Sequence, residues 1–154
     1  MAGAGKSSIG KQLADYLKFD FIDSDKLIEI NQKKSLQDVL VENGIQEFKK
    51  IEEAAILSVE FNQTVLATGG SAIFSKNAMN YIKRNSLIIY LEVPFKDILE
   101  RVPNFSDRGF IKEQSQSIYD AFKEREDLYK QSADHIVQNS GEILSCLQEI
   151  LDIL

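Results

Sequence analysis

The feature that most constrains the fold lies at the start of the chain, where Gly3-Ala4-Gly5-Lys6-Ser7-Ser8 leads directly into a helix-period segment. These residues match the end of the phosphate-binding loop pattern G-x-x-x-x-G-K-[ST]. Glycines allow backbone N–H groups to face phosphate oxygens, and a helix N-terminus adds partial positive charge. Ile9, Leu13 and Leu17 then recur along one helical face, which predicts a helix packed on a sheet. A flexible Gly/Ala terminus before an ordinary helix is the alternative interpretation.

Strand-like and helix-period segments alternate along the rest of the chain. The strand-like runs are 19–22, 64–68, 86–93 and 135–137, and the helical patterns are near 27–30, 35–44, 46–61, 77–84, after Pro94, up to Tyr129 and at 143–154. This alternation predicts an α/β fold with a parallel sheet flanked by helices on both faces. Residues 102–116 are polar and irregular, with a length typical of a mobile active-site lid. Because no repeat or linker marks a second unit, we expect a single domain over 1–154.

Composition excludes several classes of function. The 154 residues, 44% of them hydrophobic, suit one core, and the formal net charge of -6 gives no overall attraction to nucleic acid or anionic membranes. An anionic ligand must therefore be held by locally clustered cations. The single cysteine, Cys146, excludes an intrachain disulfide and a cysteine-based metal site. We expect a cytoplasmic monomer that binds a small molecule and neither nucleic acid nor a membrane.

Five further motifs follow the phosphate loop. In chain order they are F-I-D-S-D at 21–25, G-I-Q-E-F-K at 44–49, A-T-G-G-S at 67–71, an arginine at 108 and R-E-D-L-Y at 125–129. Their order and spacing resemble the shikimate kinase family over nearly the whole chain. The resemblance implies a three-layer P-loop kinase fold with substrate-binding helices at about 24–62 and a lid at about 102–116. It also implies transfer of the γ-phosphoryl group of ATP, with Mg²⁺, to the 3-hydroxyl of shikimate in aromatic amino acid biosynthesis.

The same resemblance assigns roles to individual positions. Contacts to the nucleotide are implied for Gly3, Ala4, Gly5, Lys6, Ser7, Ser8 and Arg101, the last stacked on adenine, with the adenine loop at 139–142. Contacts to the acceptor are implied for Asp25, Lys49, Gly69, Gly70 and Arg125. Mg²⁺ would be held by Ser7 and oriented by Asp23, and the catalytic residues would be Lys6, Asp25 and the lid arginine Arg108. A guanidinium fork such as that of Arg125 fits a carboxylate with two parallel hydrogen bonds.

Simpler interpretations of these residues stay open. If the strand at 19–22 continued through the two aspartates, Asp23 and Asp25 would point in opposite directions and could serve metal and substrate separately. An Asp-Ser-Asp strand exit is also a frequent helix cap. Arg101, Arg108 and Arg125 could each be solvated surface residues.

The chain also departs from the family pattern. Lys49 stands where the family places a second carboxylate-gripping arginine, Ser71 where a third glycine is usual, and Gly109 where a proline follows the lid arginine. The first glycine of the phosphate loop would fall immediately before Met1, and the apolar strand that feeds the loop is absent. We therefore expect either an upstream start or a product that folds poorly, because that strand would supply central ladder hydrogen bonds. These departures leave two alternatives: a related kinase for another polyol acid such as gluconate, and a non-catalytic relative that binds nucleotide or a protein partner.

Overall fold

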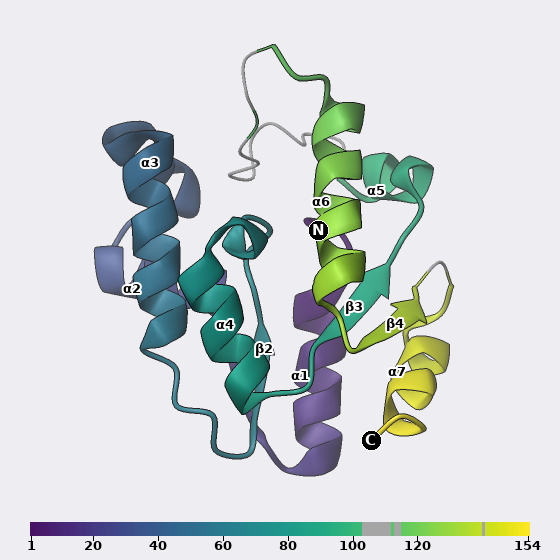
Figure 1. The fold of residues 1–154 in the computed structure, drawn as a ribbon. Helices are drawn as coiled ribbons and strands as arrows, with labels where there is room; N and C mark the ends of the chain where they lie inside the picture. Colours follow the sequence, from purple (N-terminus) through teal and green to yellow (C-terminus); the bar gives the residue numbers. More distant parts are fainter. Residues whose placement is uncertain (103–111, 113–114, 140) are drawn as a thin grey trace.

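The computed structural model describes residues 1–102, 112, 115–139 and 141–154. Its elements are α1 (Lys6–Leu17), β1 (Asp20–Asp23), α2 (Ser24–Gln32), α3 (Leu36–Leu57), β2 (Thr64–Ala67), η1 (Ala72–Phe74), α4 (Lys76–Asn85), β3 (Ile89–Glu92), α5 (Phe95–Arg101), α6 (Ile118–Ser132), β4 (His135–Gln138) and α7 (Ile143–Leu151) (Figure 1). Arg108, Gly109 and most of the predicted lid lie outside the described residues. No helix in the described part of the chain is long and apolar enough to cross a membrane.

Local sequence signals set several of these boundaries. Ser35 caps α3 by accepting a hydrogen bond at its hydroxyl from the Asp38 backbone N–H at 3.2 Å, as the capping pattern predicts. Gly44, the predicted stop, interrupts α3 with a φ of 73° and a ψ of 170°, so two helical segments meet there at a kink. Pro94 lies at the N-cap of α5, immediately before the first helical residue. β3 spans four residues and is shorter than the predicted run at 86–93.

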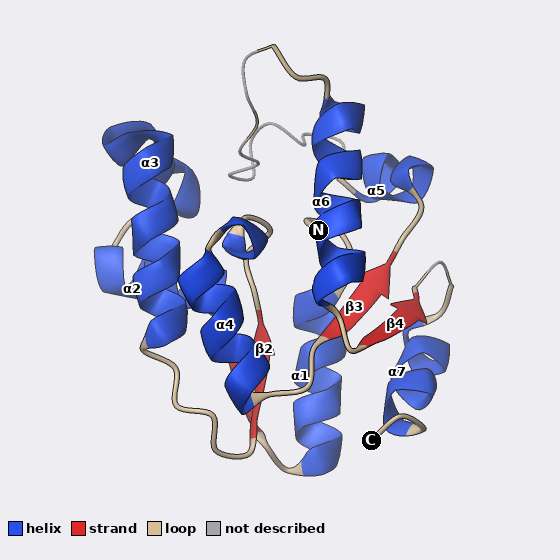
Figure 2. Cartoon of the chain, viewed as in Figure 1, coloured by secondary structure: helices blue, strands red, loops and turns tan. Residues whose placement is uncertain are grey.

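The four strands form two parallel pairs. β1 pairs with β2, with Asp20 opposite Thr64, and β3 pairs with β4, with Ile89 opposite His135. The predicted α/β architecture of parallel strands and helices is confirmed (Figure 2). Within the described residues, however, β2 and β3 share no ladder, so the strands do not form one continuous sheet. The expected gap in the central hydrogen bonds of the sheet is thus present in the structure.

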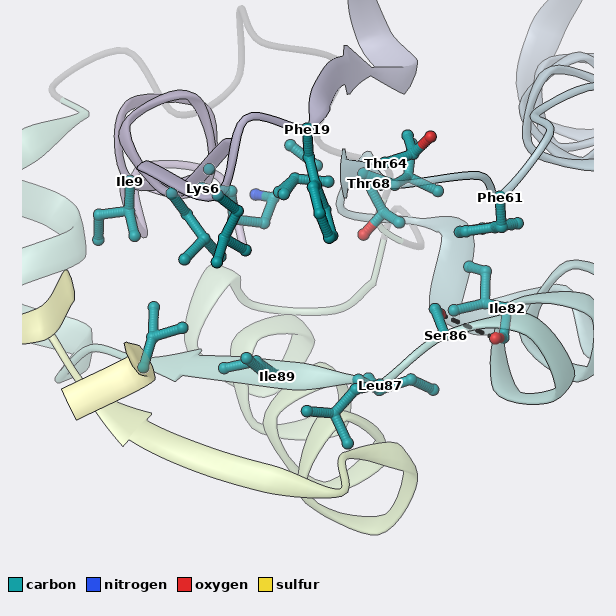
Figure 3. Close-up of a pocket in the computed structure, with 18 of the residues that line it drawn as sticks. Lys6, Ile9, Phe19, Phe61, Thr64, Thr68, Ile82, Ser86, Leu87 and Ile89 are labelled. Carbon is teal, nitrogen blue, oxygen red and sulfur yellow. Dashed lines mark hydrogen bonds between the residues drawn. The ribbon is translucent and has the colours of Figure 1, made fainter. Parts of the chain in front are cut away.

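A cavity of about 420 Å³ lies between the two strand pairs. Its lining is mainly apolar and comes from α1, from β2 and from the segment that leads into β3, and Figure 3 labels Ile9, Thr64 and Ile89 among these side chains. Lys6 also lines the cavity, which therefore adjoins the start of α1.

The buried apolar residues form three clusters around these strands. The largest joins α1, β3, α5, α6, β4 and α7, and it includes Ile9, Val93, Ile98 and Val137. A second cluster joins α2 to α3 around Phe48, and a third joins α3 to α4 around Ile56. This packing fixes α2, α3 and α6 beside the carboxyl ends of β1 and β2, where the predicted site residues lie.

Candidate active site

The loop before α1 has the backbone shape that two glycines permit. Gly3 and Gly5 have φ values of 73° and 85°, in the left-handed region that disfavours other residues. A Cβ on Gly5 would lie 2.8 Å from Asn139 Nδ2, so space as well as φ requires glycine there. Gly5 is also the N-cap of α1, and no side chain of the described residues caps this helix end. The first N–H groups of α1 are therefore left for an external anion such as a phosphate.

Two segments distant in sequence, at Arg101 and at Asn139, form hydrogen bonds to backbone carbonyls of this loop. Arg101 donates from Nη2 to the Asn139 carbonyl at 2.8 Å and from Nη1 to the Gly3 carbonyl at 3.5 Å. The Asn139 side chain donates from Nδ2 to the Ala4 carbonyl at 2.8 Å. The structure thus brings the predicted adenine-side residues, Arg101 and the start of 139–142, to the phosphate loop.

Lys6 and Ser7 connect the loop to the end of β1. Lys6 Nζ donates to the Met1 carbonyl at 2.6 Å, and Ser7 Oγ donates to Asp23 Oδ2 at 2.5 Å. Burial lowers the pKa of Lys6, while the charges of Asp25 and Asp23 act in the opposite direction. An ammonium group, a hydroxyl and two carboxylates therefore lie together at the N-terminus of α1.

Asp23 serves as a helix cap as well as a site residue. β1 ends at Asp23, whose Oδ1 accepts hydrogen bonds from the backbone N–H groups of Asp25 at 3.0 Å and Lys26 at 3.4 Å. The premise that the strand runs on through both aspartates is therefore wrong, because α2 begins at Ser24. The separation of the two carboxylates comes from the strand-to-helix turn and not from strand alternation.

The donor set at this turn fits a magnesium ion that also binds phosphate. Mg²⁺ takes oxygen ligands and usually keeps several waters besides one or two protein groups. Ser7 Oγ and Asp23 Oδ2 are two such oxygens, already in contact. Among the described residues there is no group of three or more His, Cys, Asp or Glu side chains able to hold a metal by themselves.

Asp25 presents a buried side-chain oxygen, Oδ1. Within the described residues its Oδ1 has no hydrogen bond, although it is shielded from solvent. Burial raises the pKa of Asp25, against the effect of Lys6. A Cβ on Gly69 would lie 2.5 Å from this oxygen and 2.6 Å from Glu52 Oε1, so the two carboxyl groups converge on the Gly69 backbone. An unsatisfied buried acceptor of this kind is costly and suits a ligand hydroxyl.

A second cluster of cations surrounds the ring of Phe74. The guanidinium carbon of Arg125 lies 5.0 Å from the ring centroid, and Lys49 Nζ lies 5.2 Å from it. Arg125 is 2% exposed and also donates from Nη1 to the Ala121 carbonyl at 2.9 Å. The structure thus brings together the two predicted carboxylate-binding cations, one from α3 and one from α6.

Several residues in this region were assigned no role from the sequence, although Ser24 and Tyr129 lie within the quoted motifs. Phe74 lies in η1, a turn that the sequence pattern did not predict. Tyr129 Oη donates to the Gly70 carbonyl at 2.6 Å, and Ser24 Oγ accepts from the Gly69 N–H at 2.8 Å, so both glycines are held by side chains. Glu52 is 4% exposed, and burial raises its pKa to about 7. Its position three residues after Lys49 on α3 was the one available hint.

Comparison with known proteins identifies the family. A sequence model described as "Shikimate kinase" matches residues 2–154. The chain belongs to the shikimate kinase family. It is 32% identical over 151 residues to the shikimate kinase of Sulfurihydrogenibium sp. (strain YO3AOP1), covering 97% of this chain and 90% of the relative. It is 32% identical over 155 residues to that of Clostridium beijerinckii, covering 100% of this chain and 90% of the relative.

Solved structures give the same assignment for the fold. Shikimate kinase from Acinetobacter baumannii in complex with shikimate superposes with a TM-score of 0.88 at 29% identity, covering 98% of this chain and 87% of that one. The P-loop kinase fold predicted from the sequence is thereby confirmed. Within this shikimate kinase-like site, Lys49 and Ser71 are the two described positions that depart from the expected pattern.

Proposed function

We propose that the protein transfers the γ-phosphoryl group of ATP to the 3-hydroxyl of shikimate, giving ADP and shikimate 3-phosphate. One observation carries the proposal: Oδ1 of Asp25, which is buried and has no hydrogen bond among the described residues, lies near Lys6 and converges with Glu52 Oε1 at Gly69, while Arg125 and Lys49 also lie within electrostatic reach of Glu52. A hydroxylated carboxylic acid carries a hydroxyl group that could donate to Asp25 and a carboxylate that could bind the two cations. Its hydroxyl would meet Asp25, and its carboxylate would meet Arg125 and Lys49.

On the nucleotide side, the residues that would hold ATP are those of the loop. Backbone N–H groups from Gly3 to Ser8 would bind the phosphates, and Lys6 would exchange its bond to the Met1 carbonyl for phosphate oxygens. Arg101, now bound to carbonyls behind the loop, would lie on the adenine side. Ser7 and Asp23 would hold Mg²⁺, which when bound would neutralise charge on the phosphates.

On the acceptor side, Asp25 would orient the reacting hydroxyl and accept its proton. Burial raises the pKa of Asp25 and so strengthens its carboxylate as a base, while the charge of nearby Lys6 acts in the opposite direction. Gly69 contributes by having no side chain, because a Cβ would occupy the space beside Asp25 Oδ1. Arg108 would add positive charge at the transferring group, although it lies outside the described residues.

A coupled ADP-release assay with shikimate and ATP tests the proposal. Turnover with shikimate is expected, and Asp25→Asn should reduce kcat by about a hundredfold or more while ATP still binds. Turnover with gluconate and not with shikimate would show that the acceptor is another polyol acid and not shikimate. ATP binding without turnover on either acid would point to the non-catalytic alternative.

A cytoplasmic monomer is part of the same proposal. The burial of the single thiol of Cys146, which is 2% exposed, supports a protein that needs no oxidising compartment. Sedimentation velocity of the purified chain would test the monomeric state.

A further inference from the structure

Glu52 lies among charged groups from three helices. Arg125 approaches it from α6 and Asp25 from α2, while Lys49 precedes it by three residues on α3. Of these neighbours, Asp25 raises the pKa of Glu52, and Arg125 and Lys49 lower it. A buried carboxylate in this position has two cations within electrostatic reach, and either could become its partner.

The direct partner of Glu52 is a neutral hydroxyl. Ser71, itself 6% exposed, donates from Oγ to Glu52 Oε2, while Oε1 faces Gly69. Ser71 also begins the turn that carries the aromatic ring, since its carbonyl accepts from the Phe74 N–H at 3.0 Å. One residue therefore fixes both the Glu52 carboxyl and the turn that bears Phe74.

The spacing of Lys49 and Glu52 would otherwise favour an ion pair. Lys and Glu three residues apart pair elsewhere in the protein, with 2.6 Å between Lys26 and Glu29. Among the described residues, Lys49 forms no salt bridge with Glu52, and its Nζ lies against Phe74 instead. Glu52 differs from Glu29 in being buried and in accepting a hydrogen bond from Ser71.

We propose that Ser71 is a positioning residue that binds Glu52 and so leaves the Lys49 ammonium group directed at the carboxylate of the acceptor. Ser71 and Lys49 thereby act together to determine affinity for an acidic acceptor. The acceptor part of this inference rests on the proposed function, whereas the effect of Ser71 on Lys49 does not. Without the hydroxyl, Glu52 takes Lys49 as its partner and competes with the ligand.

Kinetics give the first test. Ser71→Ala should raise the KM for shikimate by about tenfold, the effect of losing one charge-assisted contact, with kcat and the KM for ATP within about twofold. Ser71→Thr, which keeps the hydroxyl, should restore most of the affinity. Ser75→Ala is the matched control, because Ser75 Oγ donates in the same way to the neighbouring Glu53 on α3. Ser75 also caps α4, so this control additionally reports the effect of a lost helix cap.

A double-mutant cycle separates this role from a merely structural one. In a Glu52→Gln background no carboxylate is present to capture Lys49, so Ser71→Ala should no longer raise the KM. The same tenfold increase in both backgrounds, or no increase in either, would overturn the proposal.

A measurement without substrate keeps the inference independent of the proposed function. The acetylation rate of Lys49 by acetic anhydride at pH 8, followed by mass spectrometry, should fall several-fold in Ser71→Ala, because pairing with Glu52 raises the pKa of an amine. Ser75→Ala should leave that rate unchanged. Inactivity of the wild-type protein toward shikimate would reject the proposed function, whereas an unchanged Lys49 rate in Ser71→Ala would reject the role of Ser71.

Discussion

Replacement of Glu52 by glutamine should change how the stability of the protein depends on pH. Burial raises the Glu52 pKa from 4.5 to about 7 in the folded protein. Because the folded pKa lies above the unfolded value, the contribution of protonated Glu52 to the free energy of unfolding is fully present below about pH 4.5. It is lost as pH rises through about 7. With 1.36 kcal/mol per pKa unit, the loss between pH 5 and pH 8 is about 2 to 3 kcal/mol.

Urea unfolding at pH 5, 6, 7 and 8 measures this loss. Glu52→Gln has no titrating group at the position, so its stability relative to wild type should increase across the series by about 2 to 3 kcal/mol. Glu53→Gln is the matched control, because hydrogen bonds from Ser75 and Asn77 lower the pKa of this neighbouring carboxyl instead. The reasoning would be refuted if the free energies of unfolding of the wild type and Glu52→Gln differed by the same amount at pH 5 and pH 8.

Three further predictions concern the site. Lys49→Arg should lower the KM for shikimate by up to about tenfold, because it restores a bidentate fork; an unchanged or raised KM would show that this position does not bind the carboxylate. Gly69→Ala should destabilise the protein by about 2 kcal/mol or more in urea unfolding, since its Cβ would lie 2.5 Å from Asp25 Oδ1. Gly70→Ala, whose Cβ would meet nothing closer than 3.8 Å, should cost less than about 1 kcal/mol, and equal losses would contradict the steric argument. Asp23→Asn should keep the cap of α2 and hence the melting temperature, while kcat falls by about a hundredfold, and retained activity would exclude a role beside the metal.

The parts of the fold that could be predicted depend on short-range signals. The glycines before α1, the Ser35 cap and the kink at Gly44 each follow from the conformational preference of one residue. Periodicity located the helices and strands, since a buried face repeats at a fixed interval. Boundaries shifted where long-range pairing decides them, as for β3, which extends only as far as its ladder with β4.

The candidate site was predictable where residues belong to a motif and not where tertiary contacts create it. Lys6 and Ser7 directly follow the phosphate loop, and Asp25 lies in the strand-to-helix turn after β1, so local backbone geometry places each of them. Phe74 and Glu52 acquire their roles only when η1 lies against α3 and α6, an arrangement that no pattern in the chain encodes. The shifted pKa of Glu52 arises from burial, which depends on the complete fold.

The charge balance of the site explains why a neutral Glu52 suits the proposed reaction. Among the described residues, six ionisable side chains converge there, three cations and three acids, namely Lys6, Lys49, Arg125, Asp23, Asp25 and Glu52. The Met1 amino group also lies near Lys6, Arg125 and Asp25, and burial lowers its pKa well below the usual value. With all six side chains charged, they offer no net charge to a nucleotide triphosphate and an acidic acceptor. Protonation of Glu52 leaves one net positive charge inside a protein whose formal net charge is -6. Because its pKa is about 7, the approach of two anions would favour that protonated form, so ligand binding should be coupled to proton uptake near neutral pH.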